Sequence, residues 1–156
     1  MNGGNTTTTG PGTVYARFAA QAHATPAALA LRAGDRSLTY RELLQRVEQC
    51  AARLRDLDVA RGTRVAVLSE NRPEYTITQL AAAKLGALVA CLNWRLTDAE
   101  LRDSLGTVEA RVLAHSPRFA ATATRVATSN TIACDIETLC SATGPADSAG
   151  DEARPE

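Results

Sequence analysis

Lysine and histidine, two residue types that carry much covalent and acid–base chemistry, are rare in this sequence. Lys84 is the only lysine, so an amine nucleophile or a mobile ammonium group has a single candidate. Its place on an expected helix, followed by Leu and Gly, favours a solvated surface position instead. His115 follows an expected strand and has the chemistry of a general base, but the sequence offers it no neighbouring nucleophile or carboxylate. We therefore assign no catalytic residue.

The spacing of the cysteines and histidines is not that of a metal site. No two cysteines form a Cys-x-x-Cys pair, and neither histidine lies near a cysteine in the sequence. We therefore assign no metal ligand. The cysteines are Cys50, Cys91, Cys134 and Cys140, and the histidines are His23 and His115. Cys50 and Cys91 lie among apolar residues of expected elements, which favours buried, reduced thiols.

The overall charge excludes several classes of partner. The 156 residues carry 17 basic and 17 acidic side chains, with no basic patch for nucleic acid and no block of like charge for a membrane surface. Residues 1–12 lack the basic start and apolar core of a signal peptide, and no segment has the length of apolar sequence that crosses a bilayer. We expect a cytoplasmic protein with no nucleic-acid partner and no membrane span.

The first expected elements are a hairpin and an amphipathic helix. An apolar run at 27–32, the turn Ala33-Gly34-Asp35 and the segment 37–39 predict a β-hairpin. Thr39 and Glu42 then have the spacing of a capping box, which predicts a helix that ends near Asp58. Its apolar residues recur every three or four positions and so form one face.

Strands and helices alternate in the middle of the chain. Segment 65–68 is short and apolar on both faces, as in a buried parallel strand, and a helix over about 74–85 ends at Gly86. A second buried strand is expected at 87–92, so this span forms one βαβ unit. A second capping box at 97–100 opens another helix, and strands follow at 110–114 and 131–134. The fold class is α/β, with a partial, mainly parallel sheet and flanking helices.

The remaining segments have weaker patterns. Residues 120–130 are rich in Ala and Thr, and 135–139 have little periodicity. We expect one domain at 13–140, a disordered N-terminal segment at 1–12, and a disordered linker or tail at 141–156, which has no bulky apolar residues.

Five segments resemble the N-terminal region of the AMP-binding, adenylate-forming superfamily. They are Leu38-Thr-Tyr-Arg-Glu-Leu43, Gly62-Thr-Arg-Val-Ala-Val-Leu68, Asn71-Arg-Pro-Glu74, Lys84-Leu-Gly-Ala87 and Asn93-Trp-Arg-Leu-Thr97. The last is most similar to the acyl-CoA and aryl-CoA ligases of that superfamily. The resemblance covers about two thirds of the chain but only the first subdomain of such an enzyme, from Thr13 to Phe119.

The resemblance implies ATP, Mg²⁺ and coenzyme A as cofactors of a complete enzyme, and a carboxylic acid as its substrate. Members bind phosphate with a Ser/Thr/Gly-rich loop that ends in Pro-Lys, and they use a lysine in a C-terminal lid. Neither occurs in these residues. Segment 141–146 resembles the phosphate loop only faintly, because it lacks the loop's glycines and ends in Ala, and we interpret it as coincidence. We therefore assign no bound cofactor to this chain alone; ATP, Mg²⁺ and coenzyme A are implied only for a complete enzyme of the family.

Arg95 is the one candidate for ligand binding. In some CoA ligases of the family the matching arginine is close to the phosphates of the CoA nucleotide, and a guanidinium can pair bidentately with phosphate. The alternative is a simple ion pair with Asp98 or Glu100. The neighbouring Trp94 is more typical of a packing residue than of a base-stacking one.

Two hypotheses on function remain. The first is an N-terminal fragment of an ATP-dependent acid:CoA ligase that is inactive alone, with a chain that stops just short of the phosphate loop. The second is a small α/β interaction module, or a split-enzyme subunit, that pairs with itself or with the remaining ligase segments. The second rests on the expectation that a partial parallel sheet leaves faces and edges uncovered. The missing half of the sheet separately predicts an isolated chain of low stability.

Overall fold

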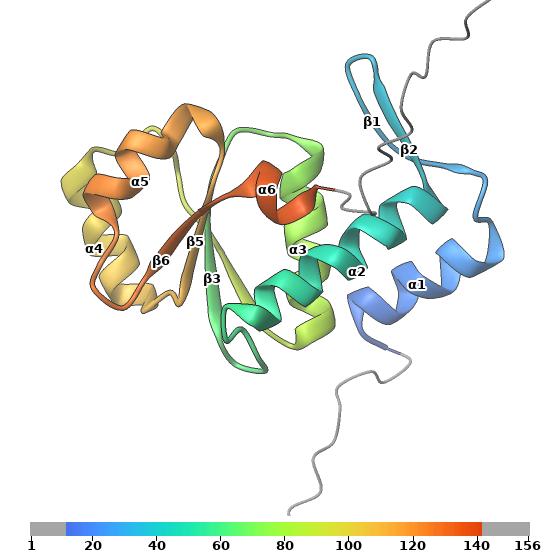
Figure 1. Ribbon diagram of the computed structural model, residues 1–156, viewed down its shortest axis with the longest axis horizontal. Coiled ribbons are helices and arrows are strands. Elements are labelled where there is room, and N and C mark those ends of the chain that lie inside the picture. Colours follow the sequence, from blue (N-terminus) through green and yellow to red (C-terminus); the bar gives the residue numbers. More distant parts are fainter. Residues whose placement is uncertain (1–11, 142–156) are drawn as a thin grey trace, which may run out of the picture.

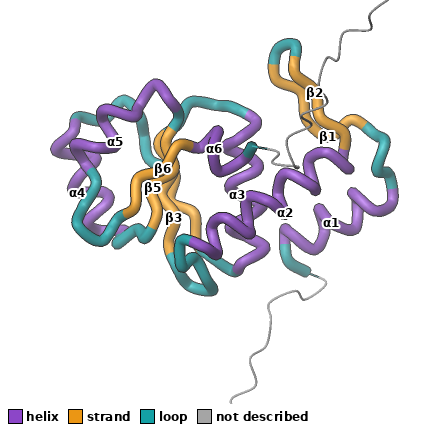
Figure 2. Tube along the Cα trace, in the orientation of Figure 1, coloured by secondary structure: helices purple, strands orange, loops and turns teal. Residues whose placement is uncertain are grey.

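The computed structural model describes residues 12–141, which form a three-layer domain with a separate hairpin (Figure 1). A sheet of four parallel strands lies in the middle layer, and Figure 2 shows it between two groups of helices. The strands are β3 (Arg64–Leu68), β4 (Leu88–Cys91), β5 (Val112–His115) and β6 (Ile132–Asp135), in the order β4-β3-β5-β6. The expected α/β class with a parallel sheet is confirmed.

Helices cover both faces of the sheet. One face carries α2 (Tyr40–Asp56), α3 (Pro73–Leu85) and α6 (Ile136–Cys140), and α1 (Val14–Ala24) packs outside α2 and α3. The other face carries α4 (Asp98–Val108), α5 (Ala120–Val126) and the short 3₁₀ turn Pro117–Phe119.

The two layers of the core follow from the alternation of side chains along β3. Val65 and Val67 point into the layer of α2 and α3, whereas Ala66 and Leu68 point into the layer of α4 and α5. Because both faces are covered, the expectation of uncovered sheet faces is wrong. The low stability expected from the missing half of the sheet stays a prediction.

The edge strand β4 differs from expectation. The segment at 87–92 was predicted to form a buried strand, but Leu88 is 59% exposed and Cys91 is also exposed. The reason is its position: within residues 12–141, β4 pairs only with β3 and has no neighbour on its other side. The apolar sequence of β4 therefore predicted a strand correctly but did not reveal that this strand lies at the edge of the sheet.

Local signals set the ends of several elements as predicted. Both capping boxes, at Thr39 and Thr97, are formed and open α2 and α4. Pro73 occupies the first turn of α3, and Gly86 ends that helix in the left-handed conformation at φ 69°. The hairpin consists of β1 (Leu29–Ala33) and β2 (Arg36–Thr39), which are antiparallel.

Three helices were not predicted. The first, α1, begins at Thr13, whose hydroxyl accepts a hydrogen bond from the Ala16 amide at 3.1 Å, and this Thr is the signal in the sequence that could have located it. The others, α5 and α6, have seven and five residues, too few to show a period. The expected disordered ends and all of the faint phosphate-loop segment except Ser141 lie outside the described residues. None of the helices described is long and apolar enough to cross a membrane.

Candidate functional site

The carboxyl ends of the four strands meet at one edge of the sheet. Three loops leave the sheet there: residues 69–72 after β3, residues 92–97 after β4, and residues 116–118 after β5. In open α/β sheets this edge is where ligands most often bind. Trp94 and Arg95, which follow β4, and His115, the last residue of β5, are therefore at this edge.

Two arginines flank Trp94 on this edge. The guanidinium carbon of Arg95 lies 4.2 Å from the centre of the Trp94 ring, and that of Arg118 lies 5.1 Å from it. The rings of Trp94 and Phe119 are 6.0 Å apart, and Trp94 packs against the core layer of α4 and α5. Trp94 is thus a packing residue, as the sequence indicated, and it also supports both guanidinium groups by cation–π contact.

The ion pair considered for Arg95 does not form. Asp98 instead accepts a hydrogen bond from Nε of Arg125 at 2.6 Å, and Glu100 accepts one from the Thr97 amide at 2.8 Å. Within residues 12–141 neither Arg95 nor Arg118 makes an ion pair, and both side chains are exposed. Two exposed guanidinium groups on one ring are suited to a phosphate or another anion.

Arg118 was not among the residues that the sequence motifs predicted. It lies in the turn after β5, some twenty residues along the chain from Trp94, and only the pairing of β3 with both β4 and β5 brings the two loops together. Its position just after a strand is the signal that could have found it.

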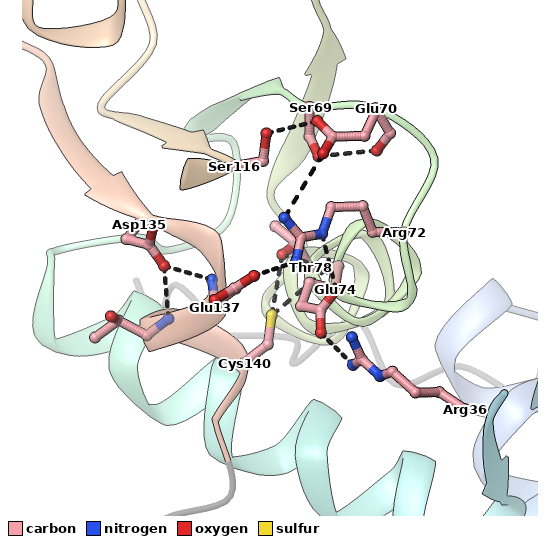
Figure 3. Close-up of polar contacts among 11 residues, drawn as sticks. Arg36, Ser69, Glu70, Arg72, Glu74, Thr78, Ser116, Asp135, Glu137 and Cys140 are labelled. Carbon is pink, nitrogen blue, oxygen red and sulfur yellow. Dashed lines mark hydrogen bonds and ion pairs between the residues drawn. The ribbon is translucent and has the colours of Figure 1, made fainter. Parts of the chain in front are cut away.

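Glu70 joins the loops after β3 and β5. The Ser116 hydroxyl donates to Oε2 of Glu70 at 2.6 Å, and Arg72 lies 3.7 Å from the other carboxylate oxygen (Figure 3). Burial raises the pKa of Glu70, but the Ser116 hydrogen bond and the charges of Arg72 and Arg118 outweigh it and hold this pKa below its ordinary value. Glu70 is therefore an anion held in place between the two loops.

Arg72 connects four parts of the fold around one guanidinium group (Figure 3). It pairs with Glu70 in its own loop, with Glu74 on α3 at 3.3 Å and with Glu137 on α6. Glu74, whose side chain is 5% exposed, also accepts a hydrogen bond from Arg36 of the hairpin at 2.5 Å. Because Arg72 already pairs with three carboxylates, we interpret it as a residue that holds the β3–α3 loop against α3 and α6, and not as one that binds an anionic ligand.

His115 is buried at the end of β5, with 8% of its surface exposed. Its Nδ1 lies 3.1 Å from the carbonyl oxygen of Ser116, and the described residues give the ring no carboxylate partner.

Lys84 and Cys91 are not where the sequence placed them. Lys84 was expected on a solvated surface, but it binds Glu48 on α2 and lies 5.2 Å from the ring centre of Tyr15 on α1. Its side chain is only 25% exposed because three helices meet around it. Cys91 is exposed on the edge strand, whereas Cys50 is buried as expected.

Comparison with known proteins relates this fold to one family. The AMP-binding enzyme family matches residues 18–154, which is most of the chain. Feruloyl-CoA synthase of an Amycolatopsis species is 41% identical over 107 residues, which are 69% of this chain and 22% of that protein. A medium/long-chain-fatty-acid acyl-carrier-protein ligase of Mycobacterium tuberculosis is 46% identical over 88 residues, which are 55% of this chain and 16% of that protein. The chain thus spans about a fifth of the length of these relatives.

Solved structures agree with the sequence relatives. The crystal structure of a putative long-chain-fatty-acid CoA ligase from Rhodopseudomonas palustris superposes with a TM-score of 0.75 at 26% identity, over 84% of this chain and 37% of that one. The parallel sheet, the two capping boxes and the family match over residues 18–154 agree with one another. This chain belongs to the AMP-binding enzyme family.

Proposed function

We propose that this chain supplies the N-terminal part of an ATP-dependent acid:CoA ligase and does not form an acyl adenylate by itself. The observation that carries the first statement is the family match together with the CoA synthase relative, which is 41% identical over 69% of the chain. The second statement rests on chemistry. Adenylate formation requires donors that hold the transferring phosphate, and these 156 residues contain no Gly-rich loop ending in Pro-Lys.

The test of this proposal is pyrophosphate release. The purified chain, incubated with ATP, Mg²⁺, CoA and a panel of aryl and fatty acids, is expected to release no more pyrophosphate than buffer does. A chimera of the Amycolatopsis feruloyl-CoA synthase, in which this chain's residues replace the matching 107-residue segment, is expected to retain feruloyl-CoA formation. Acid-dependent release by the chain alone would overturn the statement that it is inactive. A folded but inactive chimera would contradict the assignment to a ligase.

Within such an enzyme, Arg95 contacts the phosphates of the CoA nucleotide. The support is local: Arg95 is exposed at the carboxyl edge of the sheet, has no carboxylate partner among residues 12–141, and lies on the ring of Trp94, which a second arginine, Arg118, also contacts. Loss of one charge-assisted phosphate contact weakens binding by about tenfold. The chemistry of two guanidinium groups favours the nucleotide end of CoA over its uncharged pantetheine arm.

Binding is measured by calorimetric titration of CoA, dephospho-CoA and pantetheine into the active chimera. Arg95→Ala is expected to raise the Kd for CoA by about tenfold and to leave the weak binding of pantetheine unchanged. Arg17→Ala, on the exposed side of α1, removes an arginine far from this edge and serves as the matched control. Equal effects of the two substitutions would contradict the role of Arg95.

A second candidate function, an interaction module, is favoured by the free edge of β4. Leu88 is 59% exposed there, and the strand has an unpaired side among the described residues. Such an edge can pair with a strand of another chain. Sedimentation velocity at micromolar concentration is expected to show association that Leu88→Lys abolishes if this edge is used. A wild-type monomer at all concentrations would exclude self-pairing.

A further inference from the structure

Two buried thiols that lie far apart in the sequence are in contact. Sγ of Cys140 at the end of α6 lies 3.8 Å from Sγ of Cys50 in the middle of α2, and the two residues are 90 positions apart. Cys50 is 0% exposed and Cys140 is 1% exposed. No sequence motif links these two cysteines, and the proposed ligase function uses neither of them.

The fold holds the backbone around Cys140 against α2. Arg53, one turn after Cys50 on the same helix, donates to the carbonyl oxygens of Leu139 and Ser141, each at 2.8 Å. These two carbonyls flank Cys140 on both sides. Cys140 also lies 3.4 Å from the hydroxyl of Thr78 and 3.5 Å from the carbonyl oxygen of Glu74, both on α3. Contacts from both α2 and α3 therefore hold the Cys140 sulfur next to that of Cys50.

We propose that Cys50 and Cys140 are a redox-active pair that a small-molecule disulfide oxidises to a disulfide bond joining α2 to α6. The bond needs the sulfurs to approach from 3.8 Å to about 2.05 Å, a movement of under about 2 Å.

The oxidation proceeds by two exchange steps. Cys140 loses its proton, and its sulfur attacks one sulfur of the small disulfide. That S–S bond breaks, one small thiol leaves with the proton, and a mixed disulfide remains on Cys140. Cys50 then attacks Sγ of Cys140 and expels the second small thiol. Two cysteine S–H bonds are lost and one S–S bond forms, while the two electrons reduce the small disulfide to two thiols.

Burial of Cys140 determines when this reaction begins. The hydrogen-bonded contact with Cys50 and desolvation raise the pKa of Cys140, so the closed domain contains little thiolate. Helix α6 has only five residues, and its stability depends on contacts with α2 and α3 rather than on its own length. Opening of α6 exposes Cys140 to the oxidant, and reclosing returns it to Cys50. Once oxidised, α6 stays attached to α2.

The proposal is tested by mapping disulfides in the 156-residue chain carrying Cys134→Ser, which leaves three cysteines. The chain is treated with oxidised glutathione in native buffer or in concentrated urea, blocked with N-ethylmaleimide and digested with trypsin. The peptides 47–53, 85–95 and 126–156 each contain one of the cysteines, so the three pairings are distinguishable by mass. The native sample is expected to yield mainly the link between 47–53 and 126–156, and the urea sample a mixture of all three.

Two further readouts separate this bond from chance oxidation. The linked chain is expected to unfold at a higher temperature than the reduced chain, because the bond closes a loop of 90 residues, and dithiothreitol is expected to reverse the shift. Cys50→Ser in the same background is expected to trap a glutathione adduct on Cys140. No enrichment of the native link over the urea sample would overturn the proposal, and so would an unchanged unfolding temperature. The test uses no acid, ATP or CoA, so its outcome is separate from that of the proposed function.

Discussion

Replacement of Arg72 by methionine is the change that most directly tests how the edge of the sheet is held. Arg72 binds carboxylates of Glu70, Glu74 and Glu137, which belong to the β3–α3 loop, α3 and α6 (Figure 3). Methionine keeps much of the length and the apolar stem of arginine but removes the charge and every hydrogen-bond donor. The variant therefore isolates the contribution of the guanidinium group.

The magnitude follows from the exposure of each partner. Glu74 is 5% exposed and Arg72 is 17% exposed, so their hydrogen-bonded pair contributes about 1.5–3 kcal/mol. Glu70 and Glu137 are 35% and 50% exposed, and pairs of that kind contribute at most about 1 kcal/mol each. Arg36 remains bound to Glu74 at 2.5 Å, so that carboxylate keeps one partner. We expect Arg72→Met to lower the free energy of unfolding by about 3 kcal/mol.

The assay is urea denaturation at pH 7, followed by the fluorescence of Trp94, the only tryptophan, and by circular dichroism. Arg17→Met, an exposed arginine on α1, is the matched control and is expected to change stability by less than about 0.5 kcal/mol. A loss below about 1 kcal/mol for Arg72→Met, or a loss equal to that of the control, would refute the reasoning.

The effect of Arg72→Met also depends on pH. The bound arginines lower the pKa values of Glu70 and Glu74 in the folded state, against the opposing effect of burial. A carboxyl with a lowered pKa stabilises the fold above its ordinary pKa of 4.5, and this contribution is lost as the pH falls through the folded value. The stability difference between wild type and variant should therefore shrink as the pH falls below 4.5. A constant difference down to pH 2 would show that the charges are not its source.

Three further predictions concern the core and the helix contacts. Gly86→Ala places a Cβ 3.3 Å from Cγ of Arg61 at a residue with φ 69°, and it is expected to lower the free energy of unfolding by about 1 kcal/mol in urea titrations. Leu54→Ala removes a side chain that is 0% exposed, with an expected loss of about 2–5 kcal/mol, and an unchanged urea midpoint would contradict the described packing of α2. In the wild type, burial lowers the pKa of Lys84, but Glu48 and Tyr15 raise it by more, so the net shift is upward. The wild type should therefore be more stable than Lys84→Met below pH 10.5 and should lose that advantage as the pH rises through the pKa of the folded state. Thermal melts across this pH range measure the difference.

Local residue patterns were enough to predict the elements that begin or end with a chemical signal. Thr39 and Thr97 each stand three residues before a Glu, and both capping boxes form. Gly86 ends α3 because a residue in the left-handed conformation is needed there. These signals act within one turn of the chain, so they do not depend on what packs nearby.

Exposure and pairing could not be predicted in the same way. The pattern at 87–92 indicates a strand but not its place in the sheet, and the edge position of β4 explains why Leu88 and Cys91 are exposed. Lys84 resembled a surface residue because its partner Glu48 and the ring of Tyr15 come from two other helices. Such contacts join residues more than thirty positions apart, and no local pattern encodes them.

The same division applies to the sites. The sequence by itself determined the α/β class, the family resemblance and Arg95 as a candidate for phosphate contact, because these depend on short motifs whose residues are neighbours in the chain. The tertiary structure alone decided three features: the contact of both Arg95 and Arg118 with the Trp94 ring, the positioning role of Arg72 and the contact of Cys50 with Cys140. The physical reason is that parallel strands bring their carboxyl ends to one edge, and helix packing then brings distant side chains within bonding distance.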